Sequence, residues 1–192
     1  MVVVVGCPHL QAGALPAGRR AGGMAVAIAR AVVDGGARVE LVGKVGDDRA
    51  GDDLAVELER ASIGHAALLR DPAGATPADD EGPGLGLSAP DVELALRYLA
   101  DWRVIVVADP LEGDVAEAIA GSAAFAGAHQ VVIGGHGGVG IEVTHLRPGP
   151  GDHAAFAVLV GRYAAYLDQG RAPGDAFAQA SAEVGWRAAA DA

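Results

Sequence analysis

The chain has 192 residues, enough for one domain with a sizeable hydrophobic core. Its net charge of −11 argues against binding to nucleic acids or to anionic membranes, which attract basic surfaces. A single cysteine, Cys7, excludes an intrachain disulfide and a cysteine-based zinc site, and it indicates a cytoplasmic protein. No apolar run reaches the roughly 18–20 residues that span a bilayer. The apolar start, MVVVVG, has no basic segment before it, so it predicts a buried strand and not a signal peptide.

Strand-like and helix-like segments alternate along the chain. Short valine-rich runs predict buried strands, and segments with apolar residues at helical spacing predict helices. The predicted elements, in chain order, are a strand at 2–5, an irregular segment at 6–23, a helix at 24–33, a strand at 38–42, a helix at 52–61, a short strand at 66–69, a helix at 88–100, a strand at 104–108, a helix at 114–126, strands at 130–133 and 141–144, and helices at 153–167 and 175–190. This alternation predicts a three-layer α/β/α fold with a mainly parallel sheet, in a single domain over residues 1–192.

Ligands of such folds lie at the carboxyl ends of the strands, where the loop 147–152, RPGPGD, is expected. A glycine-rich loop that opens a helix directs backbone N–H groups, and the positive end of the helix dipole, at an anion. The carboxylate of Asp152 then has two interpretations. It is either a general base for phosphoryl transfer or the N-cap of the following helix, and the local sequence alone favours the cap.

Three other patterns in the sequence bear on function. GHGGVG at 135–140 matches the dinucleotide-binding G-x-G-x-x-G motif, but a strand and a proline follow it where that motif needs a helix, so a tight turn is favoured. Arg19 and Arg20 flank the irregular segment and either meet a phosphate or are simply solvated. The four histidines between residues 129 and 153 lack the spacing of a metal site, so no metal site is predicted.

Two stretches together resemble the ribokinase-like carbohydrate kinases of the PfkB family. Residues 25–63 are similar to that family's N-terminal signature: a small-residue helix, a strand, the pattern V-G-x-V-G-D-D-x-x-G over 42–51, and an amphipathic helix. The second stretch, GPGD at 149–152, is similar to the family's G-A-G-D anion-hole motif. A second candidate for that motif, APGDAF at 172–177, is interpreted as the start of the last helix, with Asp175 in a capping role.

The resemblance implies a kinase that transfers the γ-phosphate of ATP, with Mg²⁺, to a hydroxymethyl group of a sugar or nucleoside. Asp152 would be the catalytic base. The implied nucleotide-side positions are Gly135, Gly138, Gly149 and Gly151, and the implied substrate-side positions are Gln11, Gly23 and Asp47. Asp47 and its neighbour Asp48 have a second interpretation, in which they only shape the loop.

The chain also departs from the family pattern. A flexible loop over 71–87 stands where the lid strands are expected, so the lid is predicted to be reduced or absent. The chain contains no asparagine, so the N-x-x-E motif that helps to place Mg-ATP is missing. These losses leave an alternative function, a catalytically inactive ribokinase-like protein that binds a ligand or has a structural role. Uncovered sheet edges and helix faces predict a homo-oligomer.

Overall fold

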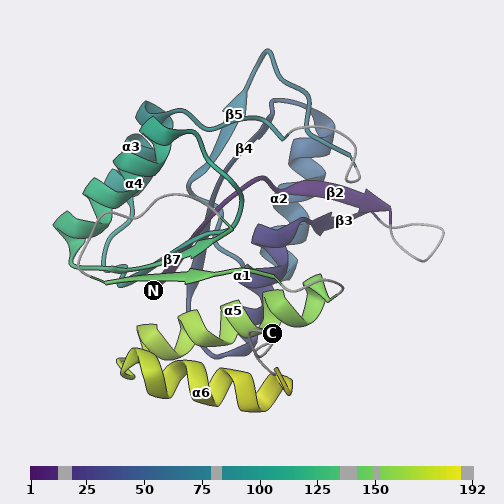
Figure 1. Ribbon diagram of the computed structural model, residues 1–192. Helices are drawn as coiled ribbons and strands as arrows, with labels where there is room; N and C mark the ends of the chain where they lie inside the picture. The colour runs from purple at the N-terminus through teal and green to yellow at the C-terminus, as the bar shows by residue number, and fades with distance from the viewer. Residues whose placement is uncertain (13–18, 79–83, 135–141, 149–151, 187–192) are drawn as a thin grey trace.

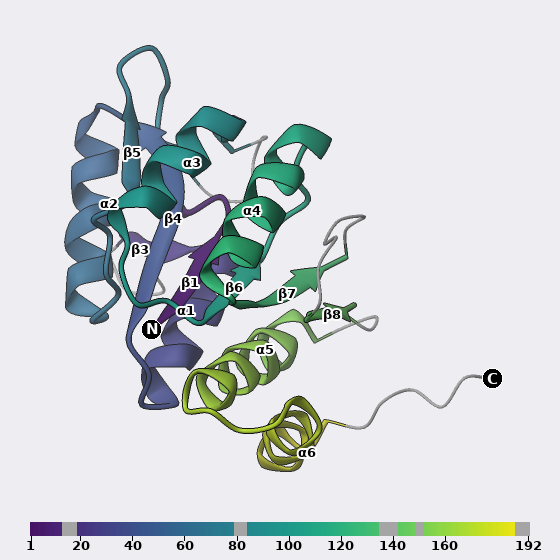
Figure 2. The ribbon, with the colours of Figure 1, turned by 90° about the vertical axis from the view of Figure 1, so that its left-hand side faces the viewer.

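The computed structural model describes residues 1–12, 19–78, 84–134, 142–148 and 152–186. Its centre is a six-stranded sheet in the order β5-β4-β1-β6-β7-β8, in which every pair of neighbours is parallel (Figures 1 and 2). The strands are β1 (Val2–Val5), β4 (Val39–Gly46), β5 (Leu68–Asp71), β6 (Val104–Val107), β7 (His129–Ile133) and β8 (Val143–Leu146). The predicted α/β fold with a mainly parallel sheet is therefore confirmed.

The four valines of β1 show why the sheet needs helices on both faces. All four are fully buried, and alternate side chains of a strand point to opposite faces. Val2 and Val4 belong to a core with helices α1 (Met24–Asp34), α2 (Arg49–Arg60) and α5 (His153–Asp168). Val3 and Val5 belong to a second core with α3 (Ala89–Tyr98) and α4 (Gly113–Ala126). Figure 2 shows these layers, with α6 (Pro173–Val184) packed on the outside of α5.

The strand order places a topological switch point between β1 and β6. The chain runs outward from β1 through β4 to β5, and then returns to build β6, β7 and β8 on the other side. The loops after β1 and β6 therefore diverge in opposite directions and leave room between them, which is where open α/β sheets bind ligands. Because all six strands are parallel, the loops that follow them lie at the same edge of the sheet.

A two-stranded antiparallel hairpin corrects the prediction that residues 6–23 are irregular. It consists of β2 (His9–Ala12) and β3 (Arg19–Gly22), and it forms a sheet of its own beside α1 and α2 (Figure 1). The hairpin carries no alternating pattern of large apolar residues, so its strands have no signal in the sequence. Its stability comes from backbone pairing and from burial of two small anchors, Leu10 and Ala21. Leu10 also pairs in parallel with Ala78, and its N–H donates to the carbonyl of Pro77 at 3.0 Å.

The described helices include none with the length and apolar character needed to cross a lipid bilayer. The last helix ends at Val184, earlier than the predicted 190, and Gly185 follows it in the left-handed conformation that commonly ends helices.

Close packing of α1 against α5 holds one face of the molecule together. Gly161 lies in the middle of α5, where a Cβ atom would come within 2.4 Å of the Ala31 side chain and 2.6 Å of the Ile28 carbonyl oxygen. Only a glycine lets the two backbones approach so closely. This contact fixes the relative position of the two helices, and with it the position of both N-terminal ends.

We expect Gly161→Ala to lower the free energy of unfolding by about 1–3 kcal/mol, because the added methyl group forces the two helices apart. Gly121→Ala is the matched control, since a Cβ atom at that position of α4 meets nothing within 4 Å. The control should be neutral or stabilising by up to about 1 kcal/mol, because alanine favours helix over glycine. Urea unfolding followed by circular dichroism measures both. Equal effects of the two substitutions would contradict the close-packing explanation.

Candidate functional site

A cleft of about 570 Å³ lies between the β2–β3 hairpin and the N-terminal parts of α1 and α5. We call it the hairpin cleft. The hairpin contributes Gln11 and Arg20, α1 and its cap contribute Gly23 and Arg30, and α5 contributes His153 and Ala154. Two of the predicted substrate positions, Gln11 and Gly23, thus line the same cavity although eleven residues lie between them in the sequence.

Asp152 is the N-cap of α5 and immediately precedes the two α5 residues that line the cleft. Its Oδ1 atom accepts a hydrogen bond from the Ala155 N–H at 2.9 Å, and the carboxylate is exposed. The capping interpretation is therefore confirmed. It does not compete with the role of a base, because the cap uses one carboxylate oxygen and a second oxygen remains for a substrate hydroxyl.

The four predicted nucleotide-side glycines, Gly135, Gly138, Gly149 and Gly151, lie outside the described residues. Asp47 is described and is exposed directly after β4, where its N–H donates to the Asp71 carbonyl at 3.0 Å. It does not belong to the described lining of the hairpin cleft. The structure therefore brings Gln11 and Gly23 together beside Asp152, but not Asp47.

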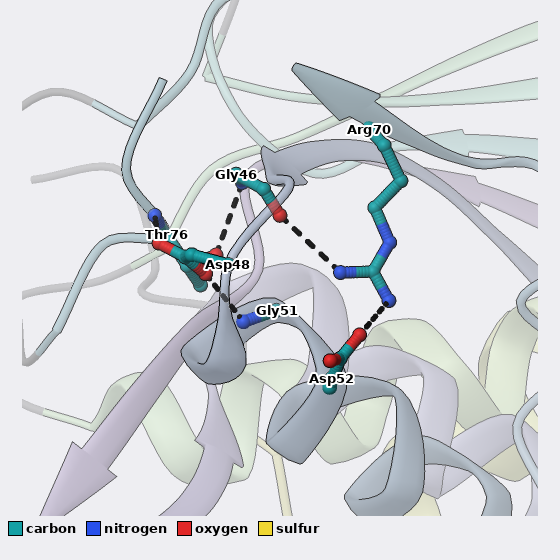
Figure 3. A network of polar contacts seen from close by, with 6 residues as sticks. All are labelled: Gly46, Asp48, Gly51, Asp52, Arg70 and Thr76. Atoms are coloured by element: carbon teal, nitrogen blue, oxygen red, sulfur yellow. Dashed lines mark hydrogen bonds and ion pairs between the residues drawn. The ribbon is translucent and has the colours of Figure 1, made fainter. Parts of the chain in front are cut away.

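Asp48, the neighbour of Asp47, organises the loop after β4 (Figure 3). It is the N-cap of α2 and accepts hydrogen bonds from the N–H of Gly51 at 2.7 Å and from the N–H and hydroxyl of Thr76 at 2.9 and 2.7 Å. The Thr76 hydroxyl in turn accepts from the Gly46 N–H at 3.0 Å. The hydrogen bonds that Asp48 accepts hold the pKa of its carboxyl below the usual value. The bond from the Thr76 hydroxyl contributes most to this lowering.

The same network explains the glycine at position 46. A Cβ atom there would come within 2.6 Å of the Gly74 carbonyl oxygen and 2.7 Å of the Thr76 nitrogen. Arg70 closes the other side of the loop by donating to the Gly46 carbonyl at 3.2 Å and to Asp52 at 3.0 Å (Figure 3). Since Pro77 follows Thr76 and pairs with the hairpin at Leu10, the network also anchors the hairpin that covers the cleft.

A second, larger cavity of about 790 Å³ lies between α3 and α4 and is lined by Trp102, Glu117 and Phe125, among others. Its residues come from the C-terminal parts of these helices. In this fold those ends lie toward the amino ends of the strands, away from the edge where α/β sheets bind ligands. We therefore place the candidate site in the hairpin cleft, in spite of its smaller volume.

No family model matches the chain, and no curated protein matches it. Several solved structures, in contrast, match the chain in fold. The "putative phosphofructokinase" of Staphylococcus aureus has 14% sequence identity and a TM-score of 0.66, over 96% of this chain and 90% of that one. The "putative Ribokinase II" of Escherichia coli, in complex with ATP and Mg²⁺, has 14% identity and a TM-score of 0.64, over 94% and 90%.

An uncharacterized sugar kinase of Pyrococcus horikoshii, in complex with ATP, has 14% identity and a TM-score of 0.53, over 70% of this chain. The match spans about half of that kinase, 53% of its length. The chain has the ribokinase-like fold. The expectation drawn from the 42–51 and 149–152 motifs is thus confirmed at the level of the fold.

In this ribokinase-like fold, a partly buried carboxylate at the switch point, Asp109, is a feature that sequence reasoning missed. Asp109 lies in the loop after β6, and Cys7 lies in the loop after β1. The Oδ2 atom of Asp109 accepts a hydrogen bond from the Cys7 N–H at 2.7 Å. Burial raises the pKa of the Asp109 carboxyl, while the Cys7 N–H and the nearby His9 oppose that rise. Burial and the Asp109 charge also raise the pKa of the Cys7 thiol, so the thiol is protonated at neutral pH and is a poor nucleophile. We interpret this contact as a tie between the two diverging loops. The Asp-Pro pair directly after a buried strand was the available signal.

We expect Asp48→Asn to destabilise the protein by about 1–2 kcal/mol at pH 7, because an amide cannot accept all the hydrogen bonds that the carboxylate accepts. A lowered pKa in the folded state means that this stabilisation is present above the unfolded pKa of about 4 and is lost as the pH falls through the folded value. The gap between wild type and variant should therefore be widest near pH 7 and narrow below about pH 4.

Urea unfolding between pH 3 and pH 7 measures this gap. Asp53→Asn is the control, since Asp53 is an exposed carboxylate of α2 with no hydrogen bond to the described part of the chain. A gap that stays constant down to acid pH, or one that Asp53→Asn reproduces, would show that the network does not stabilise the loop.

Proposed function

We propose that the protein transfers the γ-phosphate of ATP to a hydroxymethyl group of a small sugar or nucleoside bound in the hairpin cleft. One observation carries the proposal: Asp152, at the start of α5, lies beside a cleft whose other walls are the hairpin and the start of α1. The cleft opens at the edge where ribokinase-like and other α/β folds bind ligands. Solved structures with this fold include sugar kinases in complex with ATP.

Asp152 would act as the general base. Its free carboxylate oxygen accepts the proton of the substrate hydroxyl as that oxygen attacks the γ-phosphorus. Its second oxygen stays on the Ala155 N–H, which orients the carboxylate. The positive end of the α5 dipole stabilises the negative charge on the transferred phosphoryl group. Gln11, across the cleft, carries an amide that both donates to and accepts from sugar hydroxyls.

ATP and Mg²⁺ enter this proposal as one co-substrate. Gly135, Gly138, Gly149 and Gly151 are proposed to give their backbone N–H groups to its phosphates, as the resemblance to carbohydrate kinases implies. The described residues include no cluster of three or more acidic, histidine or cysteine side chains that would form a metal site of its own. Mg²⁺ commonly keeps several waters and binds through substrate phosphates with one or two carboxylates, so such a cluster is not needed.

We expect Asp152→Asn to lower kcat by about 10²- to 10⁴-fold, the usual contribution of a general base. Asparagine is as good an N-cap as aspartate, so the variant should unfold at the same urea concentration as the wild type. Asp175→Asn is the matched control, because Asp175 also lies in the first turn of a helix after a glycine. ADP release, measured with a panel of sugars and nucleosides, is the assay, and the control should keep the full rate.

If the Asp152→Asn variant kept the wild-type kcat, Asp152 would not be the catalytic base. A wild-type protein that shows a thermal shift with ATP or a sugar, but no ADP release with any acceptor, would instead identify a non-catalytic binding protein.

We also expect a homo-oligomer, as the sequence predicts. Sedimentation velocity tests this, and a single monomeric species at micromolar concentration would contradict it.

A further inference from the structure

Helices α3 and α4 form a face of the molecule that no described helix or strand covers. On the other side of the sheet α6 packs over α5, whereas Figure 2 shows α3 and α4 side by side as an outer layer. The cavity of about 790 Å³ lies between these two helices. We call it the α3–α4 groove. Its described lining shares no residue with that of the hairpin cleft, so it needs an occupant of its own.

Phe125, on the α4 side of the groove, is the most exposed large hydrophobic residue that the structure describes. It is 96% exposed, while Leu96 and Trp102, which line the same groove, are buried. A phenylalanine side chain buries about 150–250 Å² when it is covered. A stable protein interface buries about 800 Å² on each partner, so covering this one ring supplies roughly a quarter of that area. An exposed ring beside an apolar groove therefore marks an interaction surface.

The shape of α4 allows another helix to approach closely. Ala118, Gly121 and Ser122 line the groove, and all three have small side chains or none. A Cβ atom at Gly121 would meet nothing within 4 Å, so the backbone there is open. Phe125 follows Gly121 by about one helical turn and lies on the same side of α4. The surface thus carries both a hollow and a protruding ring, which is the shape that fits a second copy of itself.

The charges of the groove are also self-complementary. Arg97 lies on the α3 side and Glu117 on the α4 side, both are exposed, and within the described part of the chain neither has an ion-pair partner. A uniformly acidic or uniformly basic partner would oppose one of the two. Glu93 and Asp101, the other charged residues of the lining, are exposed, so water and salt screen their repulsion.

The direction of the helices shows how two copies can pair these charges. α3 connects β5 to β6 and α4 connects β6 to β7, and all three strands are parallel, so both helices run from the carboxyl edge of the sheet toward its amino edge. A two-fold axis along the groove then lays α3 of one copy beside α4 of the other, at the same level. Long helical side chains point toward the N-terminus, so Arg97 reaches Glu117 of the second copy. The symmetry makes this pair twice.

We propose that two copies of this chain form a two-fold symmetric dimer through the α3–α4 groove. Phe125 of each copy enters the groove of the other, and Arg97 of each copy pairs with Glu117 of the other. The groove lies on the core that contains α3 and α4, while the hairpin cleft lies at the starts of α1 and α5, on the other side of the sheet. The dimer therefore leaves the hairpin cleft open, and it forms whether or not the protein is a kinase.

Substitution of Phe125 tests the contact at the groove. We expect Phe125→Asp to raise the dissociation constant of the dimer at least about tenfold, because a carboxylate replaces an apolar ring where water is excluded. Val56→Asp is the matched control, since Val56 is an exposed apolar residue of α2 outside the groove. Sedimentation velocity over a range of micromolar concentrations measures both. Neither side chain belongs to the core, and circular dichroism checks that both variants are folded.

A mixture of two charge-reversal variants tests the symmetry. Arg97→Glu alone and Glu117→Arg alone should each raise the dissociation constant at least about fivefold, because like charges then meet at both pairs. An equimolar mixture of the two variants should dimerise to within about twofold of the wild type, because each mixed dimer contains one pair of two original residues and one pair of two reversed residues. No interaction within a single chain can produce this recovery.

Three outcomes would overturn the proposal. The first is a wild type that remains monomeric at micromolar concentration. The second is a dimer that Phe125→Asp leaves intact, or charge variants whose mixture is as weak as its components, since the interface would then lie elsewhere. The third is a monomer that binds the apolar dye ANS and loses it in Phe125→Asp, which would assign the groove to a different occupant. None of these measurements uses ATP, so they are independent of the kinase assay.

Discussion

The candidate site depends on the close packing of α1 against α5. α1 follows the hairpin strand β3 and α5 follows the edge strand β8, and the two helix backbones approach each other at Gly161. The contact lies in the middle of both helices and fixes where each one begins. α1 begins at the cap residue Gly23, and α5 begins at Asp152, and both starts open on the same cleft. Two helix dipoles thereby share one space, which neither helix would provide alone.

The β2–β3 hairpin, which forms one wall of that cleft, is held in place by residues far from it in the sequence. The hairpin emerges after β1, but its Leu10 pairs with Ala78 and Pro77, beyond α2 and β5. Thr76 is fixed in turn by the carboxylate of Asp48, the cap of α2. Asp48, the neighbour of the predicted substrate-side residue Asp47, thus supports the cleft indirectly. It places the segment against which the hairpin rests.

The core elements were predictable because their signals are local. The valine runs at 2–5 and 104–107 are buried on both faces, which is what an unbroken β-branched run means. The cap at Asp152 was equally visible. The hairpin was not, since its strands are short and are stabilised by contacts with residues 77 and 78. The lining of the cleft was also hidden, because Arg20, Arg30 and His153 come from three separate segments that meet only in the folded chain. In the sequence Arg20 is a candidate for a phosphate contact, but nothing there joins it to Arg30.

The place of β1 in the sheet has a consequence for how the chain folds. β1 is synthesised before both of its neighbours in the sheet, β4 and β6, and Val2 pairs with both Val39 and Val104. Its second neighbour, β6, is therefore made only after β4, β5 and the helices between them have been synthesised. Until then one long edge of an apolar strand has no partner and is open to non-native pairing. The many contacts between distant residues also slow the search for the native state, because each large loop must close before its strands pair.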